Sequence, residues 1–350
     1  MKKTLLILFV IIAILIFAGC GGTNSGVSEE SGTSSNQSTG TKVIQIGFTT
    51  SATVADDPYN VFASTFAKLV NERSKGSIKA EALGGGQLGQ ELEMFDGMKI
   101  GTIDAGIITN AYVGQYAPAN KLFDLPFLFK DNAQAASILD GSVGTSVLNA
   151  VGSSNLGVTA LAWGEGGFRH LVTKVKAVHI PSDMGGLKIR SMETKAYLDT
   201  YAALGVNAVP MAWAETIPAL QQGTIEGLDI PISVIYANGF AKIADYLNLT
   251  GHFYSPLVLC MSDSVYNNLT AEEKEIVKQA AVEAGQATRD NNARVEKTML
   301  AEMAEQGMTI VSDVDIDSFR NKLSSFYEGQ KKNIGGTYVD DLFAELDKLK

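Results

Sequence analysis

The sequence has few of the residues from which metal clusters, disulfide frameworks and nucleic-acid-binding surfaces are built. Its 350 residues include two cysteines and three histidines, too few for a disulfide scaffold or a zinc cluster. Basic residues number 28 against 38 acidic ones, and a net charge of −10 has the wrong sign for a protein that neutralises nucleic-acid phosphates. Hydrophobic residues are plentiful at 45%, enough for two domains with cores of their own.

The N-terminus has the pattern of a secretory signal. Two lysines precede an apolar run of 14 residues, Leu5 to Ala18, which falls short of the roughly 20 residues that cross a bilayer. Ala18 and Gly19 lead directly into Cys20, the arrangement of a bacterial lipoprotein that is cleaved before the cysteine and acylated on it, typically with palmitate. We predict a signal peptide over residues 1–19 and a body lipid-anchored to the cell membrane, in the periplasm or on the outer face of the cytoplasmic membrane. The alternative is an uncleaved N-terminal anchor.

Residues 20–41 form a predicted tether between the lipid and the body. From residue 21 onward the segment is almost entirely Gly, Ser, Thr, Asn and Gln, a composition that buries too little apolar surface to offset its ordering entropy. The second cysteine, Cys260, lies in the apolar string from Leu257 to Met261, and we interpret it as a buried core residue. Because Cys20 is assigned to lipid, we expect no intramolecular disulfide.

Strand and helix periods alternate along the rest of the chain. Asp57 is placed to cap a helix that begins at Pro58, and Thr270 begins a capping-box pattern before a proline-free helical stretch that runs to about Gly307. Strands are predicted over 42–48, 77–83 and 103–109, and a helix over 90–100. This alternation predicts an α/β fold with a mostly parallel sheet, and the last helix is long enough to bridge two lobes.

Two distant segments resemble each other. Met98 to Ile108 reads MKIGTIDAGII, and Leu220 to Ile230 reads LQQGTIEGLDI. Each places a helix end before Gly-Thr-Ile, an acidic residue, a small residue and an apolar strand. We interpret the pair as two lobes of like construction, with chance similarity as the alternative. Because ligands of open α/β sheets bind beyond the carboxyl ends of the strands, two facing lobes predict a site in the cleft between them.

Evidence for an enzyme is confined to one glycine-rich loop. Gly84 to Gly89 matches GxGxxG between a predicted strand and a predicted helix, with Asp104 farther on, a pattern typical of dinucleotide-binding loops. We favour a tight turn at the rim of a cleft, because a protein outside the cytoplasm has little access to nicotinamide cofactors. HExxH and GxSxG are absent, and the histidines lack ligand spacing. We therefore predict no catalytic residues, no cofactor, no metal site and no enzymatic activity.

Two arginines are the candidate binding residues. Arg169 follows two glycines after a predicted strand over 158–163, and Arg190 ends the segment Leu187-Lys188-Ile189-Arg190. A guanidinium at a strand end offers its planar fork to a carboxylate in two parallel hydrogen bonds. The alternative for either arginine is a structural ion pair with one of the many acidic residues.

A series of short motifs gives the chain a family resemblance. In order they are Gly86-Gln87-Leu88-Gly89, Gly101-Thr102-Ile103-Asp104, Phe123-Asp124-Leu125-Pro126-Phe127, Gly185-Gly186-Leu187-Lys188-Ile189-Arg190, Leu204-Gly205 to Pro210-Met211, and Ala219-Leu220-Gln221-Gln222-Gly223 to Glu226-Gly227. From about residue 42 to 350 the chain thereby resembles the extracytoplasmic solute receptors of TRAP transporters, the dicarboxylate-binding-protein family, in lipoprotein form.

The resemblance implies an α/β fold with two lobes, like that of periplasmic binding proteins (type II-like), with a long helix bridging both lobes. Lobe I is expected over 42–166 plus about 256–295, and lobe II over about 167–255 plus 296–350. The family captures a small organic acid in the cleft and delivers it to TRAP membrane subunits for import driven by an ion gradient. A receptor of an ATP-driven importer or a sensor remains an alternative with the same architecture, and an extracytoplasmic enzyme that uses the Gly84–Gly89 loop is another.

The resemblance also assigns roles to single residues. Arg190 resembles the family's carboxylate-clamping arginine, Arg169 resembles a second arginine found in many members, and Trp213 occupies a position where an aromatic ring packs on the ligand. The remaining candidates for ligand binding are Asp229, Glu193, Phe48, Asn110 and Tyr236.

Two departures from the family pattern bear on the ligand. Ile230 stands before Pro231 where many members have a polar residue, and Glu193 stands where sialic-acid-type members have Asn. A less polar wall with an extra acidic residue argues against sialic acid and leaves the choice of organic acid open.

Overall fold

The computed structural model describes residues 40–334 and 337–349. The predicted signal peptide, Cys20 and nearly all of the predicted tether lie outside these ranges. The strands are β1 Lys42–Gly47, β2 Ile78–Leu83, β3 Ala105–Thr109, β4 Val158–Thr173, β5 Ile189–Ser191, β6 Val209–Pro210, β7 Gly227–Pro231, β8 Tyr246–Ser262 and β9 Thr309–Val311.

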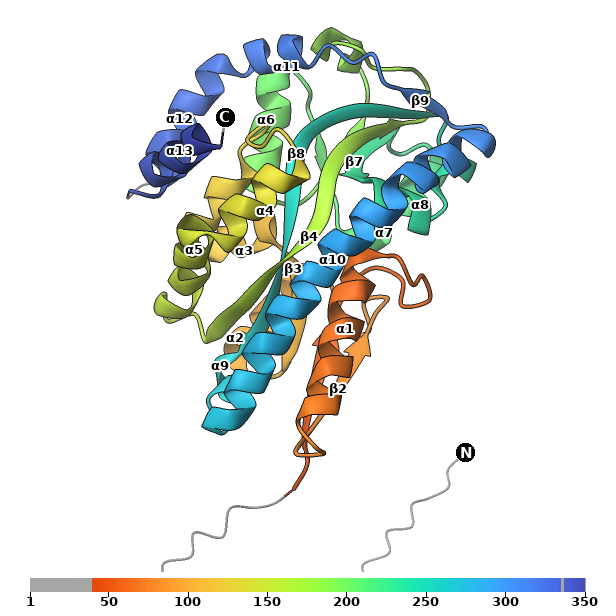
Figure 1. The fold of residues 1–350 in the computed structure, drawn as a ribbon. Helices are drawn as coiled ribbons and strands as arrows, with labels where there is room; N and C mark the ends of the chain where they lie inside the picture. The colour runs from red at the N-terminus through yellow and green to blue at the C-terminus, as the bar shows by residue number, and fades with distance from the viewer. Residues whose placement is uncertain (1–39, 335–336, 350) are drawn as a thin grey trace, which may run out of the picture. The chain divides into compact units, whose positions relative to one another are not determined.

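Helices connect and cover these strands (Figure 1). They are α1 Pro58–Arg73, α2 Glu91–Ile100, α3 Asn110–Tyr116, α4 Asn132–Asp140, α5 Ser142–Ser153, α6 Lys195–Leu204, α7 Trp213–Gln222, α8 Ile232–Ala237, α9 Asp263–Tyr266, α10 Ala271–Glu305, α11 Ile316–Lys322, α12 Ser324–Ile334 and α13 Tyr338–Lys348, with short 3-10 turns η1 Pro118–Asp124, η2 Pro181–Met184 and η3 Phe240–Lys242.

The sheet consists of two halves whose strands follow equivalent orders on either side of the centre. Its strand order is β2-β1-β3-β8-β4-β7-β5-β6, with β9 paired to β8. In one half β1 lies parallel to β2 and β3, and β3 lies antiparallel to β8. In the other half β5 lies parallel to β6 and β7, and β7 lies antiparallel to β4. The long strands β4 and β8 pair antiparallel to each other and join the halves. The prediction of a mostly parallel sheet therefore holds for the outer strands and is wrong for the centre, where the long strands β4 and β8 pair antiparallel with each other and with β7 and β3.

The two similar sequence segments adopt the same local structure. Gly101 ends α2 with a φ of 77°, and Gly223 ends α7 with a φ of 74°, the left-handed conformation that glycine tolerates best. The next residue in each segment returns its amide to the helix, since Thr102 N donates to Gly97 O at 2.9 Å and Thr224 N donates to Ala219 O at 2.9 Å. These matched turns lead into β3 and β7, the equivalent strands of the two halves.

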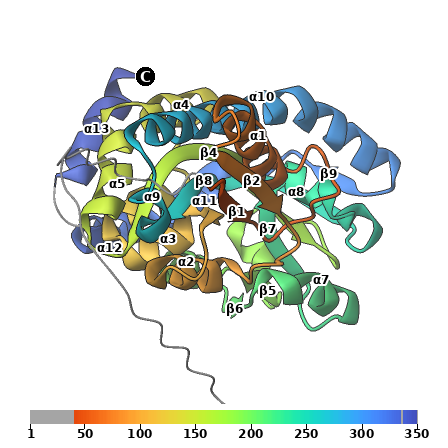
Figure 2. The ribbon, with the colours of Figure 1, turned by 90° about the horizontal axis from the view of Figure 1, so that it is seen from below.

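Helix caps lie where the sequence predicts them. The Asp57 side chain accepts hydrogen bonds from Tyr59 N and Asn60 N at the start of α1. Thr270 and Glu273 form the expected capping box at the start of α10, which runs for 35 residues. Helix α10 packs against α1, β4 and α8, and so contacts elements on both sides of the central strands. Figure 2 shows α1 and α10 on one side of the sheet and α2 and α7 on the other.

Apolar side chains fill the spaces between the sheet and these helices. Cys260, on β8, is fully buried, and burial raises the pKa of its thiol. Its predicted role as a core residue is thereby confirmed. In the part of the chain that the structure describes, none of the helices combines the length and the apolar character needed to cross a membrane.

Candidate functional site

A small cavity lies where strands from both halves of the sheet end. Its lining consists of Thr49, Thr50, Tyr59, Glu91, Thr109, Tyr112, Arg169, Arg190, Met192, Trp213, Ile230, Pro231 and Val234. The first six residues come from one half of the sheet and its helices: the segment after β1, α1, α2, the end of β3, and α3. The other seven come from the other half: β4, β5 and the residue after it, α7, β7 and α8. The cavity therefore occupies the position predicted for a ligand cleft.

Arg190 is a buried cation with no carboxylate partner among the described residues. It is 2% exposed, and its Nε and Nη2 both donate to the backbone oxygen of Met211, at 2.9 and 2.7 Å. Burial lowers the pKa of Arg190, and the positive charge of Arg169 acts in the same direction. An arginine keeps its charge under such conditions, so the cavity contains a positive charge that an anion would neutralise.

Arg169 is neutralised by the chain itself. Its Nε donates to Asp229 Oδ2 and its Nη2 to the backbone oxygen of Asp229, both at 2.6 Å. Its guanidinium also lies 5.3 Å from the ring centre of Tyr197. Burial by itself lowers the pKa of Arg169, but the charge and the hydrogen bond of Asp229, together with the nearby Tyr197 and Tyr59, raise the pKa overall. Arg169 thus lines the cavity and also makes the structural ion pair that the sequence left open.

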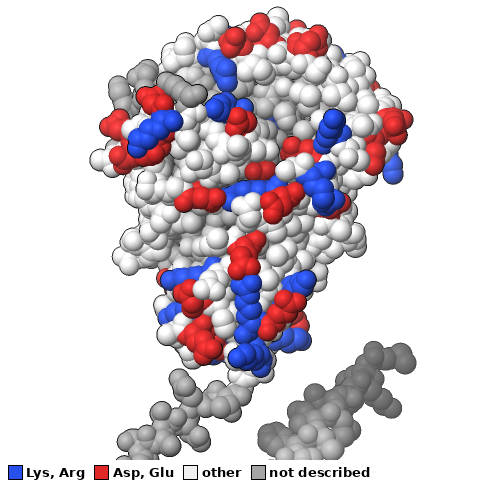
Figure 3. Space-filling view, in the orientation of Figure 1, with Lys and Arg blue, Asp and Glu red and all other residues white. Residues whose placement is uncertain are grey.

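Other arginines of the same chain, outside the cavity, are paired with acidic side chains. Arg289 on α10 makes two hydrogen bonds to Asp140, at 2.7 and 2.8 Å, and Arg73 on α1 makes two to Glu283. Figure 3 shows basic and acidic side chains close together on this face. The pairing of these arginines makes the position of Arg190 distinctive.

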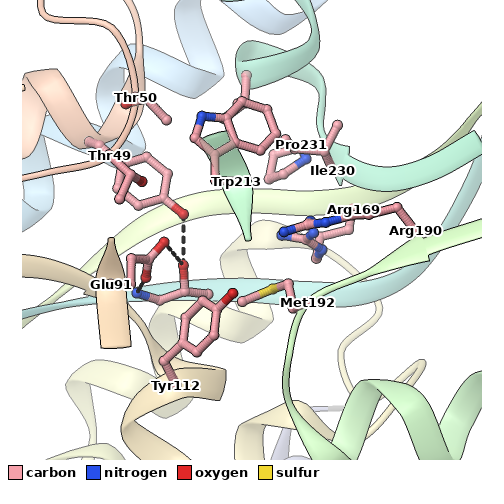
Figure 4. A pocket seen from close by; sticks show the side chains of 13 residues that line it. Thr49, Thr50, Glu91, Tyr112, Arg169, Arg190, Met192, Trp213, Ile230 and Pro231 are labelled. Carbon is pink, nitrogen blue, oxygen red and sulfur yellow. Dashed lines mark hydrogen bonds between the residues drawn. The ribbon is translucent and has the colours of Figure 1, made fainter. Parts of the chain in front are cut away.

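Glu91 faces the arginines from the other side of the cavity, as Figure 4 shows. It is the first residue of α2 and accepts hydrogen bonds from the amide and the hydroxyl of Thr109. The Thr109 hydroxyl in turn lies 2.7 Å from the Tyr59 hydroxyl. Burial raises the pKa of Glu91 to about 7, although Thr109 and both arginines oppose the shift. The cavity therefore holds an acidic group as well as basic ones.

An apolar wall completes the cavity. Trp213, at the start of α7, lines it together with Met192 and with the segment that ends β7. Ile230, which departs from the family pattern, belongs to this wall. A ligand that binds here meets apolar surface on one side and hydroxyl groups on the other.

Of the predicted binding residues, Arg190, Arg169 and Trp213 come together in the cavity lining and the others do not. Asp229 holds Arg169 from behind. Phe48 is fully buried, Asn110 donates to Asn120 O and Asp124 Oδ1, Tyr236 hydrogen-bonds Glu302, and Glu193 is exposed. A ligand contact by any of these residues remains a prediction.

Several lining residues were missed at the sequence level. Glu91 and Thr109 carried a usable signal, because each lies at the junction of a predicted strand or glycine loop with the next helix, where ligands of α/β sheets bind. No such signal marks Tyr59, Tyr112 and Met192, because nothing in the local sequence pattern distinguishes a cavity residue from a core residue at these positions.

The glycine-rich loop braces the cavity wall. Gly85 N donates to Thr50 O at 2.7 Å, and Gly86 N donates to Phe48 O at 3.0 Å. A Cβ at Gly84 would lie 2.4 Å from the Phe48 ring. These amides are occupied by backbone oxygens, whereas a dinucleotide loop aims its amides at phosphate. The loop therefore positions Thr49 and Thr50, in agreement with the prediction of a tight turn at the rim of a cleft.

Among the described residues no group of three His, Cys, Asp or Glu side chains is placed to hold a metal ion.

Comparison with known proteins identifies the family. Residues 49–333 match the family described as bacterial extracellular solute-binding protein, family 7 (DctP). The chain belongs to this family. The 2,3-diketo-L-gulonate-binding periplasmic protein of Escherichia coli shares 31% sequence identity with this chain. The match covers 90% of this chain and 93% of the E. coli protein.

Solved structures of two similar proteins contain sugar acids. A TRAP periplasmic solute-binding protein from a Polaromonas species, bound to D-erythronate, has a TM-score of 0.82 and 34% identity, covering 86% of this chain and 98% of its own. The sugar acid binding protein of Advenella mimigardefordensis, in complex with galactonate, has a TM-score of 0.83 and 27% identity, covering 89% and 99%.

These comparisons confirm the resemblance to TRAP solute receptors and the two-lobed α/β fold. The family consists of periplasmic solute-binding receptors, a class distinct from enzymes. The residue boundaries of the two lobes remain a prediction.

Proposed function

We propose that this chain is the solute receptor of a TRAP transporter, and that it captures a small organic acid in the cavity beside Arg190. The observation that carries the proposal is Arg190, a buried cation whose hydrogen bonds, among the described residues, go only to a backbone oxygen. No described residue accepts a hydrogen bond from Nη1 of Arg190 or of Arg169. A ligand carboxylate that accepts these free N–H groups gains charge-assisted hydrogen bonds of roughly 1.5–3 kcal/mol each.

Enclosure strengthens this contact. The cavity is lined from both halves of the sheet, so a bound acid is removed from water, and electrostatic attraction rises as the local dielectric constant falls. Membership of the family supports delivery to TRAP membrane subunits, with import driven by an ion gradient. We also propose that the signal peptide over residues 1–19 directs export of the chain from the cytoplasm, and that a lipid on Cys20 anchors the body to the membrane.

Replacement of Arg190 tests the binding site. Purified protein is screened by thermal shift against a panel of carboxylates that includes D-erythronate, galactonate and succinate. A ligand at about 100 times its dissociation constant stabilises a protein by roughly 2.7 kcal/mol. We expect a ligand to raise the melting temperature of the wild type, and Arg190→Ala to remove the shift, because the cavity then lacks its unpaired cation.

Arg73→Ala is the matched control. It removes an exposed arginine that pairs with Glu283 away from the cavity, and so leaves the ligand shift intact. Melting of ligand-free Arg190→Ala establishes that the variant is folded. A folded Arg190→Ala protein that keeps the full shift refutes the site, and a wild type that responds to no carboxylate refutes the function.

A further inference from the structure

We propose that Glu91 makes the receptor selective for hydroxylated monocarboxylates and against dicarboxylates. The inference rests on the proposed function and narrows its ligand class. It concerns a residue to which the sequence patterns assigned no role, on the wall opposite the two arginines (Figure 4).

The charges around the cavity match one carboxylate and not two. Arg169 is neutralised by Asp229, at 2.6 Å, which leaves Arg190 as the unpaired cation among the described lining residues. Glu91 is the acidic residue in that lining, and no described ion pair joins it to either arginine. A ligand that places one carboxylate at Arg190 therefore extends toward an acidic side chain. A second carboxylate at that end would meet a like charge whenever Glu91 is ionised, which opposes binding in a site removed from water.

Hydrogen bonding favours hydroxyl groups at the same end. The Thr109 amide and hydroxyl hold the carboxyl group of Glu91 in place, and the Thr109 hydroxyl is itself fixed by Tyr59. Thr49 and Tyr112 bring further hydroxyl groups to this side of the lining, whereas the Thr50 hydroxyl donates to Asp57. A ligand hydroxyl can donate to Glu91 and accept from these groups, whereas an ionised carboxylate only accepts. A polyhydroxy chain can thus both donate to and accept from this side of the lining, whereas a second carboxylate can only accept.

The environment of Glu91 reinforces the selection. Burial already makes ionisation of Glu91 costly, as the rise of its pKa to about 7 indicates. A second negative charge beside it would add to that cost, while a donated hydroxyl hydrogen bond would reduce it.

Two matched ligand pairs test the inference. D-erythronate and meso-tartrate differ only at C4, which is a hydroxymethyl group in one and a carboxylate in the other, and galactonate and galactarate differ in the same way at C6. Dissociation constants are measured by calorimetry on the wild type and on Glu91→Gln, which keeps the side-chain shape and removes the charge. We expect the wild type to prefer the monocarboxylate of a pair, and Glu91→Gln to reduce that preference about tenfold or more, mainly through tighter binding of the diacid.

Glu93→Gln is the control. Glu93 lies on the same helix, is exposed and is not part of the cavity lining, and a glutamine there can still accept the capping hydrogen bond from Gln90 N, so its replacement leaves the preference unchanged. A wild type that binds the diacid of a pair at least as tightly overturns the inference, as does a preference that Glu91→Gln leaves intact. Failure of both pairs to bind also overturns it. If other carboxylates bind in that case the proposed function survives, and if no carboxylate binds the proposed function fails as well.

Discussion

The two cavity arginines differ in what neutralises them. Arg169 is held by the side chain and the backbone oxygen of Asp229, while the hydrogen bonds of Arg190 to described residues go to the backbone oxygen of Met211. A buried pair of opposite charges is stable as a unit and costly to break, because the remaining partner becomes an uncompensated charge. We therefore assign Asp229 to positioning Arg169, and Arg190 to the ligand.

Asp229→Asn tests this division at the residue scale. The variant leaves the Arg169 guanidinium buried without its counter-charge, and we expect a loss of about 3 kcal/mol in the free energy of unfolding. The measurement is urea denaturation of the ligand-free protein.

Asp199→Asn provides the comparison. Asp199 pairs with Lys195 at 2.7 Å on the surface of α6, and an exposed pair of this kind contributes no more than about 1 kcal/mol. If the two variants lose equal stability, the Arg169–Asp229 pair has no special structural role.

Helix α10 packs tightly because small residues face the sheet. Ala280, Ala281 and Ala284 are fully buried, and a Cβ at Gly285 would lie 2.0 Å from the backbone oxygen of Trp163. The helix backbone thus approaches β4 closely at a point where the two halves of the sheet meet. An alanine at position 285 forces the helix and the strand apart.

Gly285→Ala is the prediction at the element scale. We expect a loss of roughly 2–3 kcal/mol in the free energy of unfolding, because overpacking at a rigid backbone contact cannot be relieved by a side-chain rotation. Gly152→Ala in α5 is the control, since a Cβ there meets no atom within 4 Å. Alanine is the better helix former by about 1 kcal/mol, so this control is neutral or stabilising. Similar melting temperatures for the two variants contradict the close-packing argument.

At the scale of the whole molecule, the proposed lipid anchor involves a single cysteine, Cys20. Among residues 40–334 and 337–349 no helix has the length and apolar character needed to cross a membrane. The other cysteine, Cys260, is fully buried in the core and is not accessible to an acylating enzyme.

Cys20→Ala tests the anchor in a bacterial host fed a palmitate analogue. We expect the wild type to incorporate the label and to fractionate with membranes, and Cys20→Ala to lose the label. Cys260→Ala is the matched control and keeps it. A labelled Cys20→Ala protein contradicts lipidation at this residue, and an unlabelled wild type that stays in the membrane fraction supports the uncleaved anchor instead.

Family membership and the α/β class were predictable because the sequence patterns that indicate them each span only a few neighbouring residues. The caps at Asp57 and Thr270 involve residues two or three positions away, and the glycine turns at Gly101 and Gly223 involve the preceding helical turn. Such interactions form wherever the local sequence permits them. The same holds for Arg190, which was found through a motif that contains it.

The pairing of charges and the selection of cavity residues were settled by tertiary structure. Arg169 and Asp229 are 60 positions apart, and Glu91 meets Thr109 across 18 positions. No local pattern distinguishes a free arginine from a paired one, or a lining tyrosine from a core tyrosine, because both depend on which strands become neighbours. The mirrored strand order, with β4 and β8 antiparallel at the centre, brings these residues together, and it is determined by packing over the whole chain and not by the conformation of any one segment.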